Sequence, residues 1–159
     1  MEQTVMKILE TVKDPEIDSI SIVDLGMVHL IEMKGERCTI KLLPTFAGCP
    51  ALDIIKGNVK KACLSQPGIK EVDVRFVYTP PWTSDRLTPN GREKLKEFGI
   101  APPPEKFTNL EEWEIHCPYC DSHYTSMENL FGPTACRSIL YCKECRNPFE
   151  AMKPISTIM

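Results

Sequence analysis

The sequence predicts a small α+β domain, with a sheet of about three strands and helices on one face, followed by a short cysteine-rich module. Three observations predict this organisation. Helix-like and strand-like patterns alternate over residues 1–98, three consecutive prolines begin at Pro102, and two Cys-x-x-Cys pairs lie near the C-terminal end. Consecutive prolines favour a stiff, extended segment and exclude helix. We therefore expect an α+β domain at 1–98, a proline-rich linker at 99–112 and the cysteine-rich module at 113–159.

The periodicity of the apolar residues places each element of the first domain. The expected helices lie at 4–12, 50–66 and 90–98, and the expected strands at 27–33, 37–43 and 72–76. The turn Lys34-Gly35-Glu36 joins the first two strands into a hairpin, and Thr88 or Asn90 is expected to cap the last helix. Helices packed on one face of such a sheet define the α+β class.

The composition excludes several classes of protein. The 159 residues are 42% hydrophobic and 26% charged, as in an ordinary globular chain, and the net charge of −3 offers no excess of cations for phosphates. We therefore expect no nucleic-acid partner. The chain has no 18-residue apolar stretch and no signal-like pattern over residues 1–10, so we expect a cytoplasmic protein without a membrane partner. Its 8 cysteines are then expected to be reduced.

The pairs Cys117–Cys120 and Cys142–Cys145 have the spacing of a zinc ribbon. Each pair forms a tight turn that directs two sulfurs at one ion, and four thiolates leave no open position for chemistry. We therefore predict a structural Zn²⁺ that supplies most of the folding free energy of this small module. An iron ion in the same four-sulfur site, and redox-active thiol pairs, are the alternatives. Cys136 does not fit the spacing and is either a thiol without a ligand role or an auxiliary ligand or transfer thiol.

The charge of the ribbon region indicates how it is used. Residues 99–159 carry 5 Lys and Arg and 8 Asp and Glu, a net charge of −3. Four thiolates and one Zn²⁺ would add about −2. Such a module repels a phosphate backbone, and we expect it to be structural or to dock on protein.

Cys49 is the N-terminal cysteine with a context for reactivity. It follows a predicted strand and precedes Pro50, which fits the first position of a helix, so Cys49 is expected to be the N-cap, where the helix dipole stabilises a thiolate. Thr45 adds a hydroxyl to the same loop. A cysteine that only caps the helix is the alternative. Cys38 and Cys63 lie on apolar faces and are expected in the core.

Four segments stand in the order and spacing of a known domain: Asp14-Pro-Glu-Ile17, Ile22-Val-Asp-Leu-Gly-Met-Val28, Pro44-Thr-Phe-Ala-Gly-Cys-Pro-Ala51 and Thr79-Pro-Pro-Trp-Thr83. They resemble the iron–sulfur cluster assembly domain of the SufT/MIP-eighteen type. With the segment Phe131-Gly-Pro-Thr-Ala-Cys136 and the two cysteine pairs, the whole chain resembles the PaaD family of the phenylacetyl-CoA monooxygenase (epoxidase) system.

The resemblance implies an accessory or maturation subunit rather than an enzyme. It implies phenylacetate catabolism, partners such as a di-iron oxygenase and its reductase, and help with iron–sulfur or di-iron centre assembly. The matching positions are Cys49 and Asp24, with Thr45 nearby. One thiolate cannot hold a transient iron or cluster, so Asp24, an exogenous thiol, or Cys49 of a second subunit in a homodimer must contribute.

Two other functions stay open on the sequence. The chain could be a non-catalytic zinc-ribbon adaptor that scaffolds a multisubunit oxygenase. It could also be a thiol enzyme with Cys49 as nucleophile, for which His29 would have to serve as base.

Overall fold

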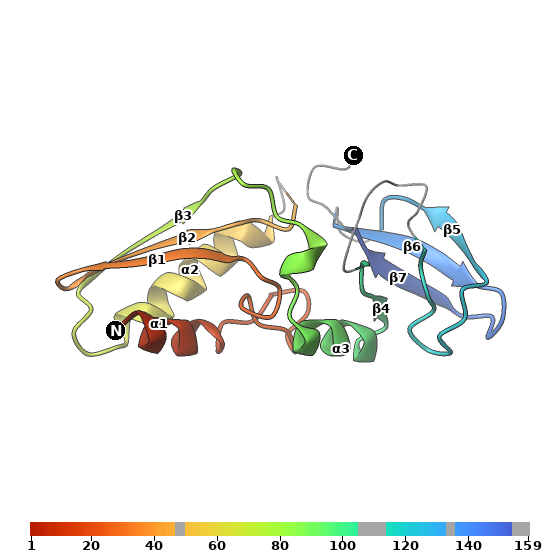
Figure 1. Ribbon diagram of the computed structural model, residues 1–159, viewed down its shortest axis with the longest axis horizontal. Helices are drawn as coiled ribbons and strands as arrows, with labels where there is room; N and C mark the ends of the chain where they lie inside the picture. Colours follow the sequence, from red (N-terminus) through yellow and green to blue (C-terminus); the bar gives the residue numbers. More distant parts are fainter. Residues whose placement is uncertain (47–49, 105–113, 133–135, 154–159) are drawn as a thin grey trace.

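The computed structural model describes residues 1–46, 50–104, 114–132 and 136–153. Figure 1 shows two sheets at opposite ends of an elongated molecule, with α3 (Pro89–Glu97) below the junction. The other elements, in chain order, are α1 (Glu2–Leu9), β1 (Val28–Lys34), β2 (Arg37–Leu42), α2 (Ala51–Leu64), β3 (Glu71–Phe76), the 3₁₀ turn η1 (Ser84–Arg86), β4 (Ile100–Ala101), β5 (Thr125–Asn129), β6 (Arg137–Cys142) and β7 (Pro148–Met152).

The first sheet has the order β1-β2-β3, and α1 and α2 cover one of its faces (Figure 1). The hairpin β1–β2 is antiparallel, and α2 is the crossover to β3, which is parallel to β2. Alternate residues of β2, Cys38, Ile40 and Leu42, are fully buried and face the helices. The predicted sheet of three strands with helices on one face is therefore confirmed.

The helix ends follow local signals that the sequence contains. The hydroxyl of Thr88 accepts the Gly91 N–H at 3.0 Å, so Thr88 caps α3 as predicted. The helix α2 is assigned from Ala51, one residue later than expected, and Pro50 precedes it with helical angles of φ −66° and ψ −19°. A shift of one residue lies within the usual uncertainty of helix ends. The predicted N-cap, Cys49, lies outside the described residues.

The second sheet has the order β4-β7-β6-β5. Its first strand, β4, consists of Ile100 and Ala101, which the sequence places in the linker 99–112; both are buried and pair in parallel with β7. A strand of two residues has no periodicity from which it could be predicted. Gly99, with φ +86°, turns the chain from α3 into β4 beside Tyr119, whose hydroxyl would lie 2.6 Å from an added Cβ.

Two hydrophobic clusters stabilise the molecule. The larger lies between the first sheet and its helices, includes Trp82, and receives Ile100 and Met152 from the second sheet. Cys38 and Cys63 are fully buried in it, as predicted, and burial raises the pKa of Cys63 to about 11. The smaller cluster belongs to the ribbon and contains Ala101, Ile115, Cys117, Leu140, Cys142, Phe149 and Ala151. The two parts of the chain thus share apolar contacts across their junction.

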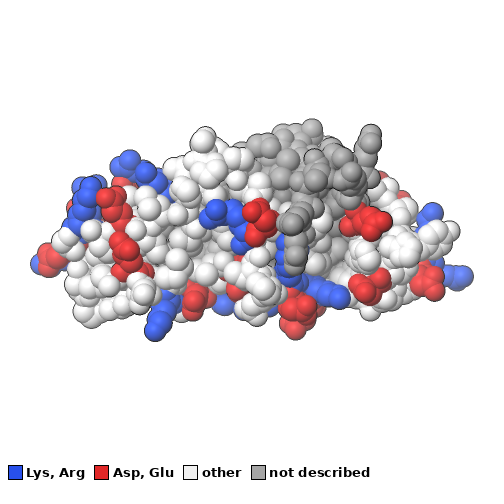
Figure 2. Space-filling view, in the orientation of Figure 1, with Lys and Arg blue, Asp and Glu red and all other residues white. Residues whose placement is uncertain are grey.

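The surface carries charges of both signs. On the face in Figure 2, lysine and arginine alternate with aspartate and glutamate over both halves, without a broad patch of either sign. Among the described residues, none of the helices combines the length and apolar character that a membrane crossing requires.

Candidate metal centre and interdomain cavity

The structure brings together the four cysteines of the predicted zinc site. The sulfurs of Cys117, Cys120, Cys142 and Cys145 all lie within 4.8 Å of one another, and the distances Cys117–Cys145 and Cys120–Cys142 are 3.7 and 3.6 Å. A tetrahedral zinc with Zn–S bonds of about 2.3 Å requires sulfurs about 3.8 Å apart. The four thiols therefore fit one tetrahedral ion of this size.

Backbone and amide N–H groups point at these sulfurs. The N–H of Tyr119 donates to Cys117 Sγ at 3.4 Å and the N–H of Cys145 donates to Cys142 Sγ at 3.5 Å, while the Asn147 amide donates to Cys145 Sγ at 3.4 Å. Such donors stabilise thiolates around a metal. The Asn147 hydrogen bond lowers the pKa of Cys145 to about 7, whereas burial raises the pKa of Cys117 to about 12.

Both cysteine turns end on a residue in the left-handed region. Asp121 follows Cys120 and Arg146 follows Cys145, and each has φ 61°. Neither is glycine, so each turn holds a side chain in a conformation that glycine adopts more readily. The two turns are therefore built alike, although their side chains differ.

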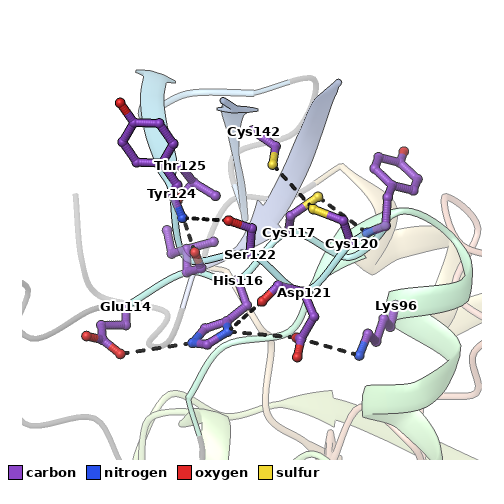
Figure 3. A network of polar contacts seen from close by, with 12 residues as sticks. Lys96, Glu114, His116, Cys117, Cys120, Asp121, Ser122, Tyr124, Thr125 and Cys142 are labelled. Carbon is purple, nitrogen blue, oxygen red and sulfur yellow. Dashed lines mark hydrogen bonds and ion pairs between the residues drawn. The ribbon is translucent and has the colours of Figure 1, made fainter. Parts of the chain in front are cut away.

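Polar contacts tie the first cysteine turn to the α+β domain (Figure 3). Asp121 Oδ1 lies 3.9 Å from Lys96 Nζ of α3 and 3.7 Å from His116 Nδ1, and His116 Nε2 lies 4.0 Å from Glu114. These groups are well exposed, and such pairs contribute little to stability. They show that the metal-binding end of the ribbon lies beside the C-terminal end of α3.

A small cavity of about 20 Å³ lies between the two parts of the chain. Thr45, on the loop after β2, and Cys136, directly before β6, both line it. Its other lining residues are Asp14, Glu16, Ile17, Leu25, Leu95, Ile100, Arg137 and Met152. Two residues that the sequence singles out, one from each part of the chain, are thus brought to the same cavity.

Asp24 lies elsewhere and holds α3 in place. Its Oδ1 accepts from Thr88 at 3.1 Å and from Asn90 at 3.2 Å, and its Oδ2 lies 3.3 Å from Lys94 Nζ. Burial alone would raise the pKa of Asp24, but the hydrogen bonds from Asn90, Thr88 and Lys94 outweigh it and lower the pKa. Asp24 is not among the residues that line the interdomain cavity. Its carboxylate is engaged by the cap of α3 and by two residues of the helix itself.

Sequence patterns did not indicate the two buried cations at the junction. Arg137, with 9% of its side chain exposed, lies 2.5 Å from Glu150 and 3.6 Å from Glu16 of the other domain. Lys153 is 2% exposed, and its Nζ lies 4.6 Å from the centre of the Phe131 ring and 5.6 Å from that of Phe46. The local pattern that could have indicated the burial of Lys153 is its position directly after the apolar end of β7. His29, in contrast, is exposed on β1 and lines a surface depression with Glu2 and Met6.

The fold and the cysteine cluster define a two-part class: an α+β domain followed by a four-cysteine β-ribbon. Comparison with known families agrees. Residues 2–76 match the model of an iron–sulfur cluster assembly protein, and residues 101–153 match that of the PaaD zinc β-ribbon domain.

The chain is similar to a putative 1,2-phenylacetyl-CoA epoxidase component of Escherichia coli, with 38% identity over 93% of this chain and 90% of that protein. It therefore belongs to the PaaD family. It is also similar to an Fe-S protein maturation auxiliary factor of Bacillus subtilis, with 38% identity over 55% of this chain and 86% of the other. A crystal structure of a domain of unknown function (DUF59) from Bacillus anthracis superposes with a TM-score of 0.55 and 31% identity, covering 59% of this chain and 90% of that one.

Proposed function

We propose that this chain is an accessory subunit of a phenylacetyl-CoA epoxidase system, which helps to assemble iron–sulfur or di-iron centres in its partner subunits through the Cys49 thiolate. The observation that carries the proposal is the order of the two domains. An iron–sulfur assembly domain and a PaaD ribbon follow one another in a chain that aligns with an epoxidase component over nearly its whole length. Relatives of the first domain alone are named as maturation factors.

The ribbon has a structural role in this proposal. Its four cysteines fit a zinc ion, and together they would occupy all four coordination positions of that ion, so that no position is left for a substrate. The bound ion would supply the folding free energy of β5–β7, and the chain's own contribution is the pair of turns that aim N–H groups at the sulfurs. The transient iron or cluster is then cargo, held by another group of residues.

In this proposal Asp24 holds α3 in place and is not a ligand of the cargo. Both of its carboxylate oxygens are engaged by residues of α3 and its cap, and a metal ion would have to displace Lys94 from it. Thr45 remains a candidate on the cargo path, because it lines the interdomain cavity and stands four residues before Cys49.

The test compares Cys49→Ser with Cys63→Ala, which removes a fully buried thiol instead. Each variant is co-produced anaerobically with the oxygenase and reductase subunits, and their iron and sulfide are measured per chain. We expect Cys49→Ser to leave partner centres underloaded while retaining its own zinc, and Cys63→Ala to load them normally. Full loading with Cys49→Ser would contradict the proposal.

A scaffolding adaptor is the second candidate, and the exposed side chains of the ribbon favour it. Tyr119 and Tyr124 are 58% and 57% exposed, and Met127 of β5 is 42% exposed. Aromatic residues and methionine are enriched where proteins dock. An adaptor predicts that Cys142→Ser abolishes assembly with the oxygenase in size-exclusion chromatography while Cys49→Ser leaves both assembly and metal loading intact.

A further inference from the structure

Gly57 lies in the middle of α2, where the packing of the described residues does not require a glycine. It is exposed, and an added Cβ would meet no described atom within 4 Å, the backbone of its own helix apart. Gly91 of α3 shows the contrast, because a Cβ there would lie 2.5 Å from the carbonyl oxygen of Asp24. Glycine inside a helix is less favourable than alanine. The fold alone would therefore be more stable with a side chain at position 57.

Gly57 belongs to a stripe of exposed residues that runs along the outer side of α2. This outer stripe consists of Ile54, Gly57, Lys61 and Leu64. Its spacing of i, i+3, i+7 and i+10 is the one at which two helices pack along a shared seam. The opposite side of the helix is buried and consists of Ala51, Ile55, Val59 and Cys63. Ile54 is 53% exposed and Leu64 is 42% exposed, so the outer stripe has an aliphatic side chain on each side of the glycine.

A depression of about 530 Å³ lies beside the outer stripe, between α2 and the segment that follows α1. Asn58 and Lys61 line it from α2, and Lys13 lines it from the other segment. The two lysines are matched by Asp14 and Asp18, which also line the depression. Helices pack by placing the side-chain ridges of one into the hollows of the other. A ridge with a hollow at its side is therefore a surface on which a second helix can lie.

The exposed surface of α2 is positively charged. It carries Lys56, Lys60 and Lys61, whereas Asp53 is the one acidic residue in the sequence of this helix. Among the described residues, no carboxylate forms an ion pair with Lys60 or Lys61. Two copies of α2 packed on each other would bring their lysines together, and such like charges across an interface are unfavourable. The charge instead favours a partner helix whose apolar edge is flanked by carboxylates.

We propose that the outer stripe of α2 is the docking surface for a helix of a partner subunit, whose carboxylates meet Lys60 and Lys61. Gly57 lets the two helix backbones approach closely, because it has no side chain to hold them apart. The inference rests on the proposed function, which supplies the partner, and deepens it by naming where that partner binds. In the sequence α2 begins two residues after Cys49, so docking and cargo transfer are assigned to neighbouring parts of the chain.

The test is a calorimetric titration of the zinc-loaded full chain with each purified oxygenase and reductase subunit. We expect Gly57→Gln, and separately Lys61→Glu, to weaken binding to one subunit about tenfold or more. Lys34→Glu is the matched control, because it makes the same change of charge at an exposed residue of β1. Equal affinity of wild type and all three variants overturns the inference, and so does a wild type that binds none of the subunits.

Thermal unfolding of the same proteins separates docking from a role in folding. Alanine and glutamine are better helix formers than glycine, and the space around an added Cβ is open. We therefore expect Gly57→Ala and Gly57→Gln to raise the midpoint of thermal unfolding, so that the loss of binding in Gly57→Gln is not a loss of fold. A lower midpoint in Gly57→Ala would show that the glycine serves the fold, and it would overturn the inference.

Photocrosslinking identifies the occupant of the surface. The photoreactive residue p-benzoylphenylalanine replaces Asn58, which lies beside the outer stripe, and the crosslinked peptide is identified by mass spectrometry. We expect a peptide of a partner subunit in which carboxylates accompany apolar residues at helical spacing. A crosslink to a second copy of this chain overturns the inference.

The Cys49→Ser variant separates this inference from the proposed function. If Cys49→Ser leaves the partner centres fully loaded while Gly57→Gln and Lys61→Glu lose binding, the role of the thiolate fails and the docking surface stands. If Gly57→Gln and Lys61→Glu bind as wild type does while Cys49→Ser leaves the centres underloaded, only the inference fails.

Discussion

The two halves of this molecule reach a folded state by different physical means. The α+β domain buries a continuous set of branched aliphatic side chains between β1–β3 and its helices. The ribbon has a much smaller cluster, and two of its members, Cys117 and Cys142, are expected zinc ligands. Apolar burial of about 25 cal/mol per Å² can stabilise the first, but a segment of this size needs a metal.

This difference shows which residues the stability of each half depends on. In the α+β domain the stability is spread over many apolar positions, each of which can be replaced at moderate cost. In the ribbon the stability depends on four sulfurs that bind one metal, so the loss of one sulfur is expected to affect the whole module. The junction combines apolar burial with a charged contact, because Ile100 and Met152 enter the large core while Arg137 forms an ion pair with Glu16 across the junction.

Removal of the metal is the strongest way to test this contrast. We expect Cys142→Ser, or a zinc chelator, to unfold β5–β7, because the lost binding free energy is on the order of 10 kcal/mol in small zinc modules. Amide hydrogen exchange should show loss of protection in β6 and retained protection in β2. Cys136→Ser is the matched control and should keep its zinc. Unchanged protection of β6 in metal-free protein would mean that the apolar cluster suffices.

The buried ion pair at the junction is expected to give the next largest effect. Arg137→Met leaves Glu16 and Glu150 without their cation, and breaking a buried pair costs about 3 kcal/mol. Arg37→Met is the control, because Arg37 pairs with Glu71 at the surface with 50% of its side chain exposed, and such pairs contribute less than about 1 kcal/mol. The measurement is the free energy of unfolding in urea, with zinc bound, for wild type and both variants, and we expect the larger loss in Arg137→Met. Equal losses in both variants would contradict the assignment of Arg137 as a buried link.

A smaller effect is expected at Asp24, within the α+β domain. Asp24→Asn keeps an oxygen for Thr88 and Asn90 but loses the Lys94 pair, and we expect a loss of about 1 kcal/mol at pH 7. The folded pKa of Asp24 is lowered from 3.8, so its contribution is present above about pH 4 and is lost as the pH falls through the lower folded pKa. The difference in unfolding free energy between wild type and Asp24→Asn should therefore shrink from pH 7 to pH 3.

The same variant distinguishes bracing from metal binding. If the only role of Asp24 is to hold α3 in place, Asp24→Asn retains as much iron as wild type does. A loss of iron without a loss of stability would instead make Asp24 a ligand.

The sequence predicted the features that depend on short patterns of residues and missed those that depend on contacts between distant parts of the chain. The strands of the first sheet and the Thr88 cap follow from periodicity and capping, which act over a few residues. The clustering of the four ribbon cysteines follows from a repeated short motif, because each Cys-x-x-Cys pair indicates a shared metal ion. The strand β4 could not be predicted, because two apolar residues after a helix have no period. Its partner β7 lies about fifty residues away in the chain.

The interdomain cavity escaped prediction for a related reason. Thr45 and Cys136 meet there only because the two sheets dock, and no local pattern encodes that docking. The burial of Lys153 depends on Phe46 and Phe131, one from each half. The sequence could single out Cys136 as unlike its neighbours, but it could not show what Cys136 faces.

The smallest expected effect concerns the second cysteine turn of the ribbon. Arg146 has φ 61°, which costs a non-glycine residue about 1 kcal/mol, and part of this is offset by the greater freedom of glycine in the unfolded chain. We expect Arg146→Gly to stabilise the ribbon by about 0.5 kcal/mol. Because folding of the ribbon is coupled to its metal, this gain should appear as a roughly twofold tighter zinc affinity in a competition assay with a chelator.

Glu144→Gly is the control, because Glu144 lies in the same turn but is not among the residues with positive φ. Glycine there adds freedom to the unfolded chain without relieving strain, so zinc affinity should fall or stay unchanged. Asp121 is a poorer site for this comparison, since its side chain also contacts Lys96 and His116. If Arg146→Gly and Glu144→Gly weaken zinc binding equally, the left-handed turn is not a source of strain, and the metal alone sets the stability of the ribbon.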